Sequence, residues 1–226
     1  MENYIAPLKK QFEALSDPVR AQWQRSYLKN QFDFYGLTAK IFREALREFF
    51  KNYGYPPHEE WEKFALFLWD LPQREYQQVV IEMIHKKAKW LKKEDIRWIE
   101  ILITGKSWWD TVDGIASWIC GTYFINFPEQ IKPVTGKWIK SGNMWLQRSA
   151  LLFQLKYKKN TDTKLLTSYI EQLLSHKDFF IRKAIGWVLR EYSKTDPKWV
   201  KTFLEEHTMS GLSYREAVKH LPKYLN

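Results

Sequence analysis

The chain has 226 residues, of which 45% are hydrophobic, so it is long enough for one large domain or two small ones and can bury a sizeable core. Its formal net charge is +10, from 36 lysines and arginines against 26 acidic residues. This charge indicates a polyanionic partner, with nucleic acid ahead of an anionic membrane surface. Solubility alone is the plainer explanation of the charge.

A single cysteine, Cys120, excludes an intramolecular disulfide and indicates a reducing compartment. Residues 1–15 carry charges and no continuous apolar run, so we expect no secretory signal. No apolar stretch is long enough to span a membrane. We therefore expect a cytoplasmic protein without a membrane partner.

Helical periodicity runs through the whole chain, with few glycines and prolines to interrupt it. Asp17 before Pro18 begins a helix, Gly36 breaks the chain, and Gly54 ends another helix. The sequence predicts about thirteen helices, over about 1–15, 18–31, 38–52, 58–69, 73–91, 93–104, 109–124, 129–140, 143–159, 162–175, 178–194, 197–207 and 213–220.

A short motif recurs early in the second helix of successive helix pairs. It reads Arg43-Glu44-Ala45, Arg148-Ser149-Ala150, Arg182-Lys183-Ala184 and Arg215-Glu216-Ala217. The separations are 105, 34 and 33 residues, so two further register positions fall on Gln78 and Asp113. The second residue after each of the six positions is apolar. A period of 33 to 35 residues is typical of an α-solenoid.

The tetratricopeptide repeat has a similar length, but its Trp/Leu-Gly/Tyr pattern is missing here. An arginine followed by a small residue looks more like a short HEAT repeat. We therefore predict an all-α solenoid of about six HEAT-like helical pairs, forming one domain over residues 1–226. Its second helices are expected to line a concave, basic face that binds DNA.

The helix predicted from Trp109 carries a carboxylate that has no obvious structural task. Ser107 and Asp110 have the spacing of an N-terminal capping pattern, which leaves Asp113 unassigned. Trp109 lies one turn before Asp113, at the edge of the apolar face. An indole beside a carboxylate suits a cationic species. The plainer alternative is an ion pair between Asp113 and Arg148 of the next repeat.

Trp187 also flanks an apolar helix face, on the same side as Gly186 and Arg190. A glycine there lets another backbone approach closely. For most other tryptophans we expect core packing, namely Trp23, Trp61, Trp98, Trp108, Trp138 and Trp199.

Other motifs give weaker indications of function. Gly105-Lys106-Ser107 ends like a P-loop, but Glu100 stands where the first glycine is needed. The five histidines lack metal-ligand spacing, so we expect no metal site. The lysines at 156, 158 and 159 form either a solvated helix end or a phosphate contact.

Two strings are specific enough to indicate a family: Ser-Trp-Trp-Asp-Thr-Val-Asp at 107–113 and Ala-Ile-Gly-Trp-Val-Leu-Arg-Glu-Tyr at 184–192. The chain resembles the AlkD-type bacterial DNA alkylation-repair glycosylases, which are HEAT-like solenoids, over nearly its whole length. The resemblance implies base-excision repair of double-stranded DNA. Positively charged N3- and N7-alkylpurines, such as 3-methyladenine and 7-methylguanine, would be excised without base flipping, unlike in most glycosylases. We expect a monomer that needs no cofactor.

The resemblance also implies site residues. The family's catalytic aspartate falls on Asp113, its two cleft tryptophans on Trp109 and Trp187, and its cleft arginine on Arg148. The further DNA contacts that we expect are Arg190, Tyr27, Arg43 and Lys156.

The chemistry of such a lesion agrees with these residues. A cationic alkylpurine leaves as a neutral base, so no general acid is needed, and the sugar becomes oxocarbenium-like. A carboxylate at Asp113 can stabilise that cation and orient a water, and indole faces can assist. No lysine stands out as a Schiff-base nucleophile, which predicts a monofunctional enzyme. The alternatives are a non-catalytic solenoid that binds DNA junctions or a protein, and, third, a generic protein scaffold.

Binding to undamaged duplex DNA is expected to be strongly salt-dependent, because lysines and arginines that contact phosphates release condensed counterions. With roughly six phosphate contacts, a plot of log K against log salt concentration slopes by about −5. A fluorescence anisotropy titration over a range of salt concentrations measures this slope. A flat response would remove the nucleic-acid interpretation and favour a protein partner.

Overall fold

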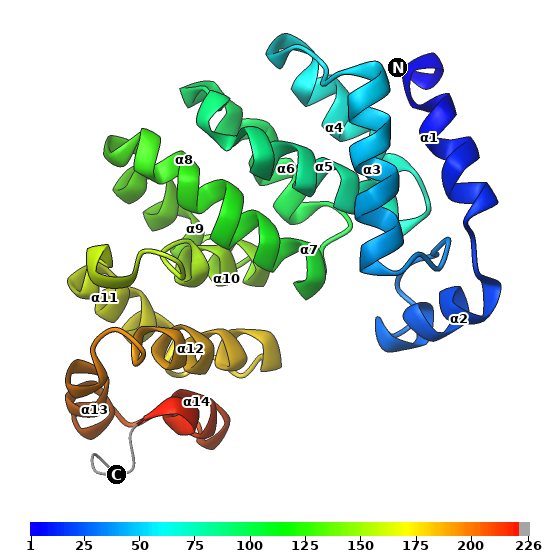
Figure 1. The fold of residues 1–226 in the computed structure, drawn as a ribbon. Helices are drawn as coiled ribbons and strands as arrows, with labels where there is room; N and C mark the ends of the chain where they lie inside the picture. Colours follow the sequence, from blue (N-terminus) through cyan, green and yellow to red (C-terminus); the bar gives the residue numbers. More distant parts are fainter. Residues whose placement is uncertain (222–226) are drawn as a thin grey trace. The chain divides into compact units, whose positions relative to one another are not determined.

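A computed structural model describes residues 1–221, which form helices and turns without a β-strand. This confirms the all-α prediction. None of the helices in this range is long and apolar enough to cross a membrane. The helices are α1 (Glu2–Ala14), α2 (Pro18–Tyr27), α3 (Ala39–Tyr53), α4 (Trp61–Asp70), α5 (Arg74–Lys87), α6 (Ile96–Thr104), α7 (Trp109–Gly114), α8 (Gly121–Asn126), α9 (Gly136–Lys140), α10 (Met144–Leu152), α11 (Thr163–Leu173), α12 (Phe179–Tyr192), α13 (Pro197–Glu206) and α14 (Gly211–Ala217) (Figure 1).

The helix predicted over 109–124 is continuous but not uniform. A π-helical segment, Ile115–Cys120, joins α7 to α8. The helix predicted over 143–159 is too long, because α10 ends at Leu152. Beyond it the Gln154 side chain accepts the Asp162 N–H at 2.7 Å and donates to the Asp162 carbonyl at 3.3 Å. These two bonds hold the chain in a turn that leads to α11.

The predicted cap at Ser107 is wrong. The Ser107 hydroxyl donates to the Ile103 carbonyl at 2.6 Å and so closes the end of α6. The N-cap of α7 is Trp108, and no side-chain bond within residues 1–221 caps that helix. The predicted start at Pro18 is confirmed, because the Asp17 carboxylate accepts the Arg20 N–H at 3.0 Å.

The chain forms two compact units, residues 1–98 and the part from Ile99 on. The single domain over 1–226 therefore stays a prediction. In the first unit α1 packs on α3 and α4 packs on α5. Gly36 has a φ of +87°, and a Cβ there would lie 2.2 Å from the Asp17 carbonyl oxygen, which explains the predicted break.

Helix α2 differs from the other helices of the first unit, because every one of its residues is at least partly exposed. Trp23 is 64% exposed, and its ring stacks on Tyr27 with centroids 5.4 Å apart. The expected core packing of Trp23 is therefore wrong. Trp61, Trp98 and Trp138 are buried as expected. Trp108 and Trp199 are half-buried.

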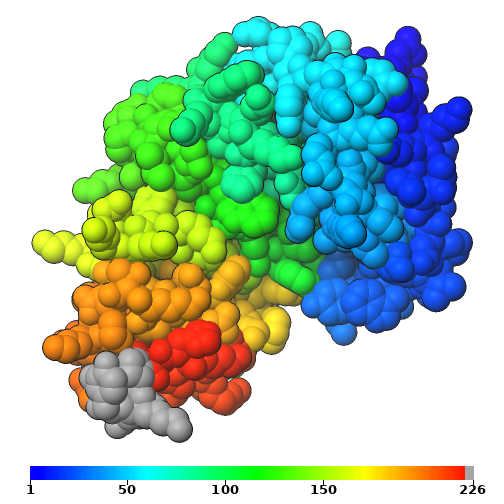
Figure 2. Space-filling view, in the orientation of Figure 1, coloured from blue at the N-terminus to red at the C-terminus, as the bar shows by residue number. Residues whose placement is uncertain are grey.

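In the second unit, α7 with its π-helical continuation, then α10, α12 and α14, pack one on the next. Figure 2 shows the segments of this unit following one another from green to red. A step of 33 to 35 residues along the sequence therefore leads from one helix of this stack to the next. The apolar residue two positions after each of the six register positions is buried: Ala45, Val80, Ile115, Ala150, Ala184 and Ala217.

Helices α12 and α14 approach closely at Gly186. A Cβ at this position would lie 2.4 Å from the Glu216 Cβ and 2.5 Å from the Ser213 carbonyl oxygen. Only a residue without a side chain permits this contact. The close backbone approach predicted at Gly186 is confirmed, and it fixes where α14 lies on α12.

Gly186→Ala is expected to lower the free energy of unfolding by about 1–3 kcal/mol, because the added methyl group overlaps the backbone and a Cβ of α14. Gly136→Ala is the matched control, since a Cβ at Gly136 meets nothing within 4 Å. There the loss of backbone freedom in the unfolded chain gives a gain of about 0.4–1 kcal/mol. Urea unfolding measures both, and equal effects would contradict the close packing.

Candidate active site

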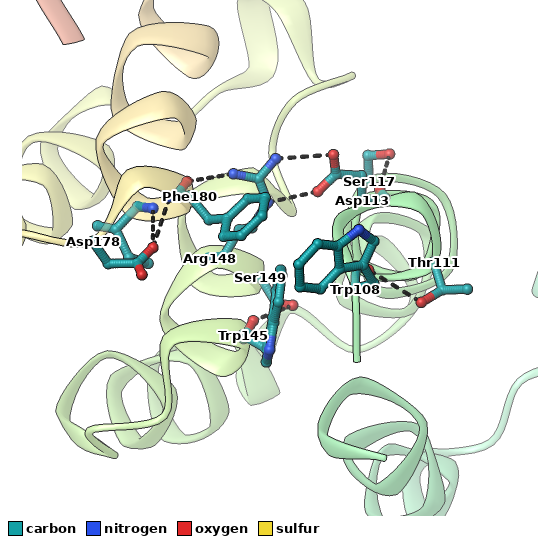
Figure 3. Close-up of polar contacts among 10 residues, drawn as sticks. Trp108, Thr111, Asp113, Ser117, Trp145, Arg148, Ser149, Asp178 and Phe180 are labelled. Atoms are coloured by element: carbon teal, nitrogen blue, oxygen red, sulfur yellow. Dashed lines mark hydrogen bonds and ion pairs between the residues drawn. The ribbon is translucent and has the colours of Figure 1, made fainter. Parts of the chain in front are cut away.

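Asp113 and Arg148 form a two-bonded ion pair between α7 and α10. Arg148 Nε donates to Asp113 Oδ1 at 2.7 Å, and Nη2 donates to Oδ2 at 2.9 Å (Figure 3). The third nitrogen, Nη1, donates to the Phe180 carbonyl at the start of α12. The ion pair that the sequence left as an alternative is therefore present. One guanidinium therefore joins α7, α10 and α12, which pack one on the next.

The pair is largely withdrawn from water. The Asp113 side chain is 16% exposed and the Arg148 side chain is 5% exposed. Burial raises the pKa of the Asp113 carboxyl above its ordinary value, while the hydrogen bonds and positive charge of Arg148 act in the opposite direction. Arg148 thus offsets the cost of keeping a carboxylate in this position.

A cavity of about 360 Å³ opens beside the pair, within the second unit. It is lined by Trp109, Asp113, Arg148, Phe179, Phe180, Lys183, Trp187, Arg190 and Glu216. The structure therefore brings the three residues expected to be catalytic together with Arg148 and Arg190. The Arg148 guanidinium carbon lies 5.9 Å from the centre of the Trp187 ring. Both cavity tryptophans are half-buried.

The helix starts around the pair are held by caps and by aromatic packing. The Asn143 side chain accepts the Trp145 N–H at 2.9 Å at the start of α10, and Asp178 accepts the Phe180 N–H at 2.6 Å at the start of α12. The Trp108 ring lies 5.1 Å from the Phe180 ring and 5.9 Å from the Trp145 ring (Figure 3). These contacts hold the starts of α7, α10 and α12 side by side.

The backbone just after Asp113 departs from regular α-helix. The Ser117 hydroxyl donates to the Asp113 carbonyl at 2.7 Å, inside the π-helical segment. A π-helical turn shifts backbone bonding from i+4 to i+5, and such turns are frequent at functional sites. Nothing in the hydrophobic pattern of the sequence indicates this segment.

The opposite wall of the cavity carries a second charge cluster. The Glu216 carboxylate on α14 accepts from Lys183 Nζ at 2.7 Å and from Arg190 Nη1 at 2.8 Å, both on α12. Lys219 Nζ is a third partner at 2.5 Å. Burial alone would raise the pKa of Glu216, but Lys183 and Lys219 lower it to about 2.

The sequence missed several lining residues. Lys183 lies one turn before Trp187 on the same helix face, a signal that spacing alone could have given. Glu216 lies 33 residues after Lys183, at the equivalent position of the next repeat, so the register could have indicated this pair. The register does not indicate how closely α14 packs on α12, and that packing brings the carboxylate to the cavity. Phe179 and Phe180 lie at the start of α12, before the string at 184–192 that indicated the family.

The other expected DNA contacts lie outside this cavity. Tyr27 is exposed and belongs to the first unit, as does Arg43, whose Nε lies 4.0 Å from Glu82. Lys156 is exposed in the turn after α10. Their roles stay predictions. Within residues 1–221 no group of three or more histidine, cysteine or acidic side chains is arranged to hold a metal ion.

Asp113→Asn is expected to lower the free energy of unfolding by about 3 kcal/mol, because it leaves the buried Arg148 guanidinium without its anion. Without an ion pair, the near-isosteric change to asparagine would leave stability nearly unaltered, but the pair is present. Adding Arg148→Met removes the stranded charge, so the double variant should lose less than the sum of the single variants. Urea unfolding of all three tests this, and additive losses would contradict it.

Residues 8–221 match the family model described as "DNA alkylation repair enzyme". A solved structure described as a predicted DNA alkylation repair enzyme from Enterococcus faecalis is 30% identical, with a TM-score of 0.85, over 92% of this chain and 97% of that chain.

Two Streptococcus mutans structures share the fold. AlkD2 is 18% identical with a TM-score of 0.63 over 89% of this chain and 99% of that chain. The protein smu.31 is 17% identical with a TM-score of 0.61 over 90% of this chain and 100% of that chain. A search of curated proteins found no match. The family model and the Enterococcus structure together establish that this chain belongs to the DNA alkylation repair enzyme family.

Proposed function

We propose that the protein is a monofunctional DNA glycosylase that hydrolyses the N-glycosidic bond of cationic N3- and N7-alkylpurines in duplex DNA. One observation carries the proposal. In a member of the DNA alkylation repair enzyme family, the carboxylate of Asp113 lines a cavity together with the indoles of Trp109 and Trp187.

The lesion itself determines what a catalyst must supply. An alkylated purine already bears a positive charge, so the base departs with the bonding electron pair as a neutral molecule. The positive charge then develops on the sugar, where a fixed carboxylate and the electron-rich faces of two indoles stabilise it. Water adds to the anomeric carbon, and Asp113 orients that water and takes up its proton.

The ion pair supports this role of Asp113. Each carboxylate oxygen has lone pairs beyond the one that accepts from Arg148, and the side chain remains partly exposed at the cavity. Because Arg148 fixes the carboxylate before DNA arrives, little reorganisation is needed as charge develops.

Arg148 receives a different role from the one expected. All three of its nitrogens donate to protein acceptors, and its side chain is 5% exposed, which leaves little of it for a phosphate. We infer that Arg148 positions Asp113 rather than contacting DNA directly.

Phosphate contacts are better supplied by cations that reach the cavity surface. Arg190 and Lys183 lie on its wall, and Lys156, Tyr27 and Arg43 are proposed to contact DNA elsewhere. We propose that the protein acts as a monomer in the cytoplasm, without a cofactor, and that the lesion stays in the duplex while its sugar meets Asp113.

Asp113→Asn is expected to reduce single-turnover release of 7-methylguanine or 3-methyladenine by on the order of 10²–10⁴, because the group acts as charge develops. Trp109→Ala is expected to reduce the same release rate about 2- to 30-fold, since a cation–π contact contributes about 0.5–2 kcal/mol. Trp118→Ala is the matched control, because that indole is exposed and lies outside the cavity lining. Rates are measured with enzyme in excess, at a temperature where every variant is folded.

Undamaged DNA is expected to bind the Asp113→Asn variant at least as tightly as it binds the wild type, because the change removes one negative charge. A variant that excises at the wild-type rate would make the ion pair purely structural. That result would favour the non-catalytic, DNA-binding alternative.

A further inference from the structure

Helix α14 contributes a single carboxylate to the cavity, and that carboxylate joins two cations of α12. Lys183, Trp187 and Arg190 lie at positions i, i+4 and i+7 of α12, on one face of the helix. Glu216 accepts from the first and the last of them, at 2.7 and 2.8 Å. The indole expected to meet the sugar is thus flanked by two cations held by the same anion.

Exposure within this cluster is uneven. The Glu216 side chain is 7% exposed, whereas those of Lys183 and Arg190 are 36% and 23% exposed. Lys219 adds a third cation to the same carboxylate. The cluster therefore keeps a net positive charge, with the anion inside and the cations toward solvent. Lys183 and Arg190 each have further N–H groups that an anion in the cavity can accept from.

The position of Glu216 is fixed by the backbone. Its Cβ lies where a side chain at residue 186 would stand, so Gly186 is what allows α14 to bring the carboxylate between the two cations. The neighbouring Ser213 hydroxyl donates to the Arg182 carbonyl at 2.9 Å and ties the same two helices. A carboxylate held this firmly can orient long, flexible side chains.

We propose that Glu216 is a positioning residue that holds Lys183 and Arg190 on either side of Trp187, so that they grip the DNA phosphates flanking the lesion at a fixed place relative to Asp113. The inference rests on the proposed glycosylase function. Lysine and arginine lose rotamer freedom when they bind a phosphate, and Glu216 removes that freedom beforehand. It does not touch the reacting atoms.

This role predicts opposite effects on binding and on chemistry. Removing the negative charge makes the surface more cationic, which strengthens non-specific binding to DNA. The released lysine and arginine then contact phosphates in many arrangements, few of which place the sugar at Asp113. A merely structural residue would instead lower stability, binding and excision together.

The test is Glu216→Gln, with Glu191→Gln as the matched control. Glu191 is on α12, pairs at 2.6 Å with Lys194 just beyond the end of that helix, and lies outside the cavity lining. Both changes remove one negative charge. For Glu216→Gln we expect single-turnover excision of 7-methylguanine to fall on the order of 10-fold at saturating enzyme, with affinity for undamaged duplex equal or higher. Glu191→Gln should excise as the wild type does.

Two further variants separate positioning from folding. Glu216→Asp keeps the charge but shortens the side chain, so excision should fall without any gain in affinity. In a Lys183→Ala/Arg190→Ala background, Glu216→Gln should cause no further loss, because the residues through which it acts are gone. Thermal melting accompanies each variant, and if Glu216→Gln does not fold, Glu216→Asp decides, alone and in the double-alanine background.

Several results would overturn the inference. One is excision by Glu216→Gln equal to that of Glu191→Gln, and another is parallel loss of stability, affinity and rate. A full further loss in the double-alanine background would do the same. If the wild type itself releases no alkylated base, the proposed function fails first. If the wild type is active and Glu216→Gln excises as the control does, only this inference is refuted.

Discussion

The second unit depends on the hydrogen bonds that the Arg148 guanidinium donates. The guanidinium ties Asp113 on α7 and the Phe180 carbonyl at the start of α12 to its own helix α10. A carboxylate this far from water is costly unless a cation meets it with good geometry. That geometry requires three helix starts to lie side by side, and the caps at Asn143 and Asp178 together with the rings around Trp108 hold them there.

The two carboxylates that line the cavity contact different numbers of cations. Asp113 meets one guanidinium in a one-to-one pair, whereas Glu216 is outnumbered by its cations. The first arrangement keeps a negative group at the centre with its direction fixed. The second gives the rim a positive field that attracts a polyanion. In the proposed function, this surface attracts the phosphate backbone while Asp113 faces the sugar.

Features that follow from local or periodic interactions could be predicted from the sequence. The 35-residue register placed Asp113 opposite Arg148, and Asp17 before Pro18 marked a helix start, as the structure has them. Prediction from the sequence failed where a distant group decides. The Ser107 hydroxyl goes to the preceding helix, and α2 offers Trp23 no core to enter. Glu216 lies 33 residues after Lys183, so the same register pairs these two residues, but only the close packing of α14 on α12 at Gly186 shows that the carboxylate reaches the cavity.

The π-helical segments affect the number of residues in each repeat. A π-helical turn takes up about one residue more than an α-helical turn. Two such segments, Ile115–Cys120 and Ile131–Thr135, lie between Asp113 and Arg148, which are 35 residues apart, while Arg182 and Arg215 are 33 apart. The spatial period of the stack and the numerical period of the sequence therefore need not coincide. An alignment that applies the 33-residue spacing of Arg182 and Arg215 throughout would place Ile115, not Asp113, opposite Arg148.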